Sequence, residues 1–244
     1  MELWWVLALA AAGFVAATSN AAVGIGGGLL VMPILSLWFP PRLAVAYTIP
    51  MFFASTLVIA WRYRGQVDRR FLAWLVPGVF MGIAAGSWFL RAASPVVVRW
   101  VMGVTAVFFV GMEAVRLATR RRGPVLPFWS AIPLSLISGL ASSMTNLGGT
   151  IVSLTMLGRD LPPARFVGTL NAIMLTMGAT KIAAFYALGV VTPRGLVLAL
   201  PSIPAVFLGS ALGQFFNRRL SPTVFRWMLV GVIALSAILL LVGY

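Results

Sequence analysis

Residues 3–38 read LWWVLALAAAGFVAATSNAAVGIGGGLLVMPILSLW and contain no charged side chain. A hydrocarbon core about 30 Å thick is crossed by about 20 apolar residues in an α-helix, so this stretch exceeds one crossing. Small and polar residues interrupt it where a charged loop would be expected, namely Thr18-Ser19-Asn20 and Gly24-Ile25-Gly26-Gly27-Gly28. The stretch therefore predicts a membrane-embedded helix that is broken at 20–28.

Seven further apolar stretches follow, at 44–61, 71–90, 96–115, 126–157, 166–188, 195–216 and 223–243. The stretch 126–157 is also longer than one crossing, and small and polar residues interrupt it at 145–150. We therefore expect an all-α polytopic membrane protein with about eight transmembrane segments, two of them interrupted.

The composition of the 244-residue chain excludes most other classes of protein. Hydrophobic residues make up 61% of it and charged residues only 9%, against about 25% charged residues in soluble domains. The 18 basic residues outnumber the 4 acidic ones, but they lie in short breaks between apolar runs, unlike those of a nucleic-acid-binding protein. Cysteine and histidine are absent, which removes disulfides, nearly every transition-metal site and histidine-based catalysis. We expect no catalytic residues, no metal and no cofactor.

The two halves of the chain match each other in sequence. The matched positions are Gly13 to Asn20 with Gly139 to Asn146, Pro40-Pro41 with Pro162-Pro163, Pro77 with Pro201, Gly82 and Gly86 with Gly209 and Gly213, and Ser94-Pro95-x-x-x-Arg99-Trp100 with Ser221-Pro222-x-x-x-Arg226-Trp227. Their order is preserved and the offsets stay between 122 and 127. We therefore predict two transmembrane repeats, 1–117 and 126–244, joined by a basic linker at 118–125. Internal duplication with interrupted helices is typical of secondary transporters.

The arginines leave the orientation of the chain open. If all eight segments cross the membrane once, nine arginines lie on the side of the termini and eight lie on the other. The two densest clusters, 62–70 and 116–122, both lie on the terminal side, so the positive-inside rule favours cytoplasmic termini. If the long stretches re-enter instead, each half has three crossings and a hairpin, and the halves could be inverted. The sequence does not choose between these topologies.

The two interruptions form the candidate binding site. Glycines let the backbone unwind at membrane depth, which exposes amide groups and the positive end of a half-helix to an anion. Close helix packing is the alternative use of small residues, and hydroxyl groups can instead bond carbonyls of their own helix. The candidate substrate-binding residues at the interruptions are Asn20, Gly24, Gly26, Gly27, Gly28, Ser143, Thr145, Asn146, Gly148, Gly149 and Thr150.

Lys181 is the only lysine and lies within the apolar stretch 166–188. An ionisable residue inside a membrane segment is costly and indicates function. The alternative is snorkelling, in which the long side chain reaches the membrane interface. We expect Lys181 to supply a positive charge to the site, and Asn171 on the same segment to share the cavity.

A resemblance to a known family rests on the first interruption. The stretch from Asn20 to Leu35, NAAVGIGGGLLVMPIL, is followed by Pro40-Pro41 and a helix rich in small residues. It resembles the first half of the TauE/SafE family of sulfite and organosulfonate exporter-type permeases. The resemblance covers nearly the whole chain and implies an integral inner-membrane transporter of small sulfur oxyanions or sulfonates. The second half departs from it, because Leu147-Gly148-Gly149-Thr150 is a shorter glycine cluster.

The function expected from these features is secondary transport of a small sulfur-containing anion, such as sulfite, thiosulfate or an organosulfonate, by alternating access of the two repeats. The alternative is the membrane subunit of a multi-component transport system with a separate energising protein. The expected partners are the small anion and the lipid bilayer, with no nucleic acid, and the oligomeric state is open. We expect the chain in the inner membrane of a bacterium.

Overall fold

The computed structural model describes residues 10–15, 17–18, 40–119, 128–156, 161–192 and 200–219, together with positions 7, 35, 197, 231, 234 and 238. Every regular element within these residues is a helix, and no strand occurs among them. The all-α prediction is therefore confirmed for this part of the chain. The predicted interruption at 20–28 lies outside the described residues.

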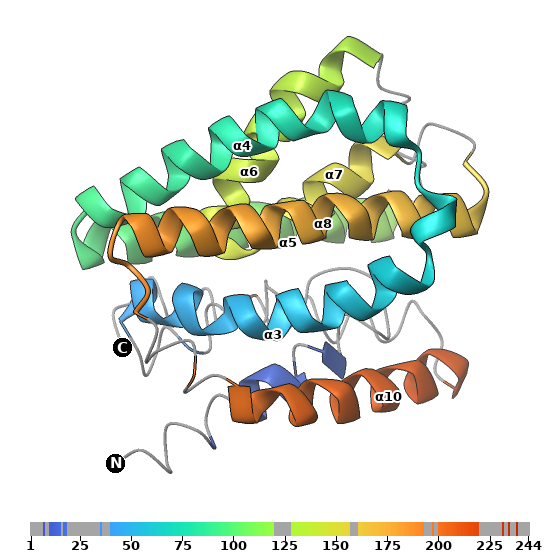
Figure 1. The fold of residues 1–244 in the computed structure, drawn as a ribbon. Coiled ribbons are helices and arrows are strands. Elements are labelled where there is room, and N and C mark those ends of the chain that lie inside the picture. The colour runs from blue at the N-terminus through green and yellow to red at the C-terminus, as the bar shows by residue number, and fades with distance from the viewer. Residues whose placement is uncertain are drawn as a thin grey trace. The chain divides into compact units, whose positions relative to one another are not determined.

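The helices follow the apolar stretches closely (Figure 1). Their bounds are α3 Pro41–Arg62, α4 Arg69–Ala92, α5 Pro95–Thr119, α6 Ala131–Thr145, α7 Gly148–Met156, α8 Pro163–Ala187 and α10 Ile203–Arg219, with single 3-10 turns η1 Arg64–Gln66, η2 Phe128–Ser130 and η3 Leu200–Ser202. The segments Leu43–Arg62, Arg69–Ala92 and Pro163–Ala187 are long and apolar enough to cross a membrane. These three helices support an integral membrane protein. The number of eight transmembrane segments stays a prediction.

The sequence sets where these helices begin. Pro41, Pro95 and Pro163 each stand at the first position of a helix, where the missing N–H is not needed and the fixed φ favours the helix. Asp68 precedes α4, and its carboxylate accepts a hydrogen bond from the Phe71 amide at 3.0 Å. Such a side-chain bond satisfies one of the amide groups that a helix start leaves without a partner.

The chain forms two compact units, and each combines segments of both predicted repeats. Unit 1 consists of Met1–Met51, Ala93–Arg122 and Pro193–Tyr244, and unit 2 consists of Phe52–Ala92 and Gly123–Thr192. Unit 2 therefore contains α4 from the first half of the chain and α6, α7 and α8 from the second half.

The core of unit 2 is one face of α4 packed with α7 and α8. Its buried residues are Phe71, Leu75, Val79 and Ile83 of α4, Ala131 of α6, Val152 and Met156 of α7, and Ile173 and Met177 of α8. The spacing of four residues places the α4 side chains on one face of the helix. Large apolar residues on the rest of α4 are exposed, including Trp74, Met81 and Trp88. An exposed apolar face is what lipid tails require of a membrane helix.

Small residues let α4 and α6 approach closely. Gly78, Gly82 and Gly86 of α4 face the backbone of α6, and a Cβ atom at Gly82 would lie 2.8 Å from the backbone nitrogen of Leu140. A Cβ atom at Gly139 of α6 would lie 2.5 Å from the carbonyl oxygen of Val79. Larger side chains at these positions would separate the two helices, as in other membrane-helix pairs with small residues four apart.

The same kind of contact occurs within unit 1. A Cβ atom at Gly13 would lie 3.0 Å from Val206 Cγ2, and one at Gly209 would lie 3.0 Å from the Cα atom of Phe14. In the predicted repeat, Gly13 matches Gly139 and Gly209 matches Gly82. Matched glycines thus make similar close helix contacts in each unit.

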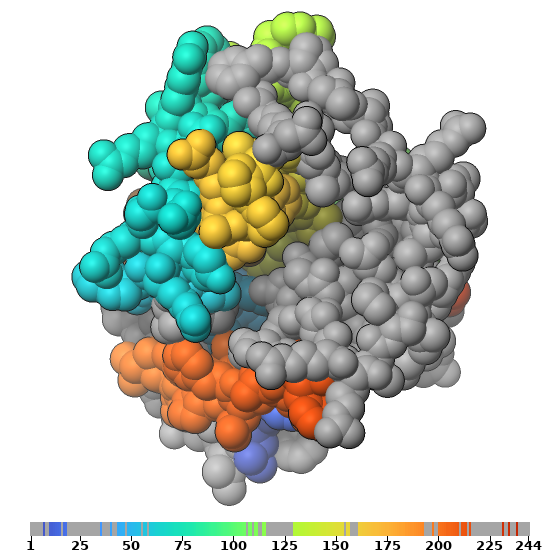
Figure 2. Space-filling view, turned by 90° about the vertical axis from the view of Figure 1, so that its right-hand side faces the viewer, coloured from blue at the N-terminus to red at the C-terminus, as the bar shows by residue number. Residues whose placement is uncertain are grey.

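The connection between α3 and α4 packs against the start of α8 (Figure 2). A Cβ atom at Gly168 would lie 2.7 Å from the carbonyl oxygen of Gln66, so only a glycine lets the connection approach this closely. Next to it, the Asp68 amide donates a hydrogen bond to the Thr169 hydroxyl at 2.8 Å. These contacts fix the end of α3, the start of α4 and the start of α8 at one end of unit 2.

Candidate functional site

The predicted interruption at 145–150 is present. Helix α6 ends at Thr145 and α7 begins at Gly148, so Asn146 and Leu147 separate two helices. Asn146 has the left-handed values φ 56° and ψ 22°, and among the described residues no other non-glycine residue has a positive φ. Asparagine tolerates this conformation better than most residues and is found at helix C-termini for that reason. The Asn146 amide donates to the Ser142 carbonyl at 3.2 Å, which closes the last turn of α6.

Hydrogen bonds and close packing hold the second helix at this break. The Ser138 hydroxyl donates to the Gly148 carbonyl at 2.6 Å. A Cβ atom at Gly148 would lie 2.5 Å from the Ser142 Cβ atom and 2.7 Å from the Ser138 carbonyl oxygen. Gly148 therefore has no room for a side chain, and α7 starts directly against α6.

Lys181 binds the break from α8. Its ammonium donates to the Ser142 carbonyl at 3.1 Å and to the Asn146 side-chain oxygen. Lys181 is 5% exposed, so its charge is held inside unit 2 rather than at a membrane interface. The C-terminal end of a helix carries a partial negative charge, and a cation is favourable there. The snorkelling alternative for Lys181 is therefore not what the structure shows.

The start of α7 offers hydrogen-bond donors beside this cation. Within the described part of the chain, the amides of Gly148 and Gly149 have no hydrogen-bond acceptor, while the Thr150 amide donates to the Leu147 carbonyl at 3.0 Å. Two free amides at a helix N-terminus favour a bound anion. Lys181 and α7 thus place positive charge and free donors around one break.

Two methionines of α8 cover these glycines. A Cβ atom at Gly149 would lie 2.8 Å from the Met174 sulfur, and one at Gly148 would lie 2.9 Å from the Met177 sulfur. A methionine side chain is unbranched and flexible, so it can fill this space and leave it at little cost. In the structure the methionine side chains occupy the space beside these two glycines where a Cβ atom would lie.

Ser143 and Thr145, also predicted to bind substrate, instead donate their hydroxyl hydrogens to backbone carbonyls. The Ser143 hydroxyl donates to the carbonyls of Gly139 at 3.2 Å and Ile83 at 3.3 Å. The Thr145 hydroxyl donates to the Ala141 carbonyl at 2.9 Å, within its own helix. Both residues are at the break, but their hydroxyl hydrogens are already bonded to the protein.

Asn171 is not brought to the break. Its side-chain amide donates to the Val167 carbonyl at 2.9 Å, within α8. It precedes Lys181 by ten residues, which is about 15 Å along a helix. Asn20, Gly24, Gly26, Gly27 and Gly28 lie outside the described residues, so their role stays a prediction.

The sequence reasoning missed Ser138, Met174 and Met177. Ser138 lies four residues before Ser142, and the two methionines precede Lys181 by four and seven residues. Residues at these spacings share one face of a helix. The helical spacing from Lys181 was therefore a signal that could have identified both methionines.

Apolar helices of membrane-crossing length, assembled around a broken helix that holds a buried cation, define a polytopic integral membrane protein. The chain belongs to the sulfite exporter TauE/SafE family, whose profile matches residues 9–240. A protein from Methanocaldococcus jannaschii named "probable membrane transporter protein" is 22% identical over 259 residues, which cover 94% of this chain and 92% of that protein. No solved structure matches the chain significantly. The chain is a membrane transporter and not an enzyme.

Proposed function

We propose that the chain is a secondary transporter of a small sulfur-containing oxyanion, such as sulfite, thiosulfate or an organosulfonate. The observation that carries the proposal is the buried Lys181 ammonium at the α6–α7 break, beside two amides for which the described residues offer no acceptor. Membership of the sulfite exporter TauE/SafE family supports this class of substrate.

The charge balance around Lys181 supports an anion as the ligand. Of the four acidic residues, Asp68 is the one whose side chain lies in the described part of the chain. Its carboxylate accepts a hydrogen bond from the Phe71 amide, and its backbone amide donates to the Thr169 hydroxyl. Thr169 precedes Lys181 by twelve residues, about 18 Å along α8. In the described part of the chain, the ammonium donates to one carbonyl oxygen and one amide oxygen and forms no ion pair. Neutral oxygens leave the positive charge uncompensated, and a bound oxyanion would compensate it.

An oxyanion needs several donors and no metal at such a site. One N–H of Lys181 remains beyond the two that bond Ser142 and Asn146. The amides of Gly148 and Gly149, for which the described residues provide no acceptor, would supply two further donors. Three donors from two helices match the several oxygens of a sulfur oxyanion, and charge-assisted bonds to such oxygens are the strong ones.

The transport mechanism we propose is alternating access of the two repeats, 1–117 and 126–244, in a bacterial inner membrane. The matched glycine contacts in the two units support a duplicated architecture. Interrupted helices in corresponding positions of two repeats are typical of transporters that bind substrate where the helices break.

Uptake into proteoliposomes tests the proposal. Radiolabelled sulfite, thiosulfate, sulfoacetate and taurine should be compared, and we expect saturable uptake of at least one. Gly148→Ala should reduce that uptake, because the new Cβ atom would lie 2.7 Å from the Ser138 carbonyl oxygen and would displace the start of α7. Gly111→Ala is the matched control, since a Cβ atom there meets nothing within 4 Å. Absence of uptake for all four anions, or equal losses in both variants, would contradict the proposal.

A further inference from the structure

Two hydrogen bonds show that α4 and α8 run in the same direction. The Asp68 amide, just before α4, donates to the Thr169 hydroxyl near the start of α8 at 2.8 Å. The Arg91 guanidinium, at the end of α4, donates to the Leu188 carbonyl just after α8 at 2.7 Å. Both helices therefore begin at one end of unit 2 and finish at the other.

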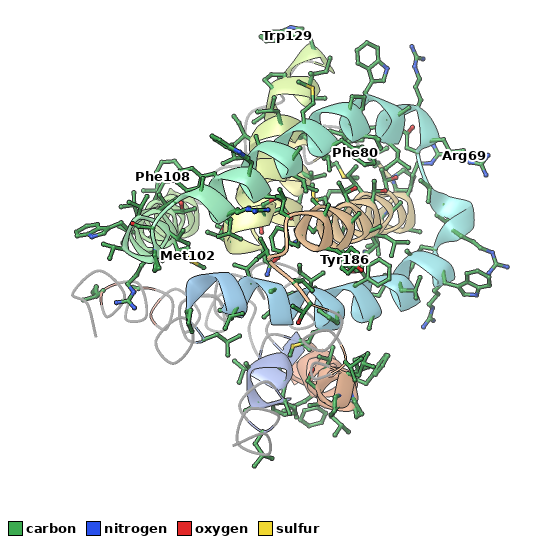
Figure 3. The ribbon with its side chains drawn as sticks, turned by 60° about the vertical axis from the view of Figure 1, so that its left-hand side comes forward. Arg69, Phe80, Met102, Phe108, Trp129 and Tyr186 are labelled. Carbon is green, nitrogen blue, oxygen red and sulfur yellow. The ribbon has the colours of Figure 1, made fainter. Side chains whose placement is uncertain are left out.

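The end of unit 2 where α4 and α8 begin is rich in arginine. We call it the arginine face and define it by Arg62, Arg64, Arg69, Arg70 and Arg165, which are all exposed. Figure 2 shows the connection between α3 and α4 beside the start of α8, and Figure 3 shows Arg69 extending away from the helices.

Helix α6 runs away from the arginine face. Gly78, near the start of α4, lies against Ser135 of α6, whereas Gly86, further along α4, lies against Ser143. The two helices are therefore parallel, and α6 begins on the same side as α4. Its C-terminal end reaches the depth of Lys181, to which it is hydrogen-bonded.

The chain must then return to the arginine face. Lys181 follows Pro163 by eighteen residues, which places the break about 27 Å along α8 from its start. The next helix after the break, α7, leads to Pro163, where α8 begins at the arginine face. Between the break beside Lys181 and Pro163, the chain therefore returns over the same distance to the arginine face. Helices α6 and α7 therefore form a hairpin with its tip at Asn146 and Leu147.

We propose that 126–157 is a re-entrant hairpin that enters and leaves the bilayer at the arginine face, and that this face lies at the acidic headgroups of the cytoplasmic leaflet. The hairpin contributes no crossing, so α8 crosses in the same direction as α4. This topology does not depend on which substrate the protein carries.

The distribution of arginine over the whole chain supports this orientation. If 126–157 is a hairpin and each other segment from 44–61 onward crosses once, thirteen arginines lie on the side of the arginine face and four on the opposite side. The thirteen are Arg62, Arg64, Arg69, Arg70, Arg116, Arg120, Arg121, Arg122, Arg159, Arg165, Arg218, Arg219 and Arg226, and the four are Arg42, Arg91, Arg99 and Arg194. Eight simple crossings gave nine against eight. The positive-inside rule therefore assigns the arginine face to the cytoplasm, where acidic lipids attract basic residues.

The topology also inverts the two predicted repeats. If 3–38 is a hairpin like its counterpart, each repeat has three crossings, and an odd number places the second repeat upside down. Both termini then lie outside the cytoplasm, the reverse of the orientation that eight crossings favoured. The count of thirteen against four does not change with 3–38, because that stretch and the residues before it contain no arginine.

Single cysteines test the proposal directly, because the natural chain has none. Trp129→Cys lies just before α6 and Pro162→Cys lies just before α8, and both positions are exposed (Figure 3 labels Trp129). Gln66→Cys marks the arginine face and Ala92→Cys marks the opposite end of α4; both are also exposed. A membrane-impermeant maleimide is applied to spheroplasts before and after permeabilisation, with labelling of denatured protein as the measure of total thiol.

We expect cysteines at 66, 129 and 162 to react only after permeabilisation, and the cysteine at 92 to react in intact spheroplasts. Opposite accessibility of positions 129 and 162 would overturn the hairpin. Reaction of 66, 129 and 162 in intact spheroplasts would overturn the cytoplasmic assignment. Ser130→Cys and Leu161→Cys replace either hairpin variant that fails to accumulate. Anion uptake is not the readout, so failure here is distinct from failure of the proposed transport function.

Discussion

Replacing Lys181 by Met tests the site most directly, since Met keeps the apolar stem and removes the charge. Two of the three ammonium hydrogens bond Ser142 and Asn146, which leaves one for a substrate oxygen. A hydrogen bond from a charged group contributes about 1.5–3 kcal/mol, so anion affinity should fall roughly ten- to a hundredfold. Lys181→Arg keeps the charge in a different shape and should retain more affinity than Lys181→Met.

The same substitution also removes two bonds from the break, so stability needs a separate measurement. The Ser142 carbonyl would still accept a bond from the Asn146 amide at 3.2 Å, which limits the loss. Arg91→Gln is the matched control, because Arg91 also donates to a carbonyl at the end of a helix but is exposed and lies at Leu188. We expect the control to change anion affinity little.

The assay is calorimetric titration of sulfite and thiosulfate into purified protein in detergent, with thermal unfolding measured without anion. A lower melting temperature with unchanged affinity would show that Lys181 only holds the break together. Equal anion affinities for the wild type, Lys181→Met and Lys181→Arg would remove Lys181 from the binding site.

Four further predictions concern other positions. Gly82→Leu should prevent α4 from packing on α6, because even a Cβ atom there lies 2.8 Å from the α6 backbone; size-exclusion chromatography should show aggregation. Ser87→Ala should raise the melting temperature, since the buried hydroxyl has no partner among the described residues, whereas Ser143→Ala should lower stability by about 1 kcal/mol. Glu113→Gln should retain substantial transport, because a chain without histidine has few members for a side-chain proton relay; complete loss with normal expression would identify Glu113 as the relay. Gly26→Leu should abolish transport while membrane insertion persists, and wild-type uptake by that variant would argue against a backbone site at 24–28.

Local features of the sequence predicted much of the fold. The stretch 71–90 predicted α4, which spans Arg69–Ala92, and 145–150 predicted the break at Asn146 and Leu147. These features are local because apolar length sets the span of a helix and small polar residues set its interruption. Asn146 was predicted as part of the break because it lies among these small and polar residues.

The contacts of the site could not be predicted in the same way. Lys181 and Asn146 were each identified, but 35 residues separate them, and their hydrogen bond depends on how α8 packs on the end of α6. The direction of α6 and α7 likewise depends on which residues of α4 they contact. The pattern of apolar residues in the sequence does not reveal these contacts. For this reason the sequence left crossing and re-entry equally open for 126–157.

The glycine contacts between α4 and α6 also decide which parts of the protein can move. Helix α4 precedes the linker at 118–125 and α6 follows it, yet their backbones are too close for a side chain to fit between them at Gly82 or Gly139. A hinge at the linker would have to pull these interlocked helices apart, at the cost of their van der Waals contacts. Alternating access of the two repeats is therefore expected to leave this contact intact, with α4 and α6 moving together as one body.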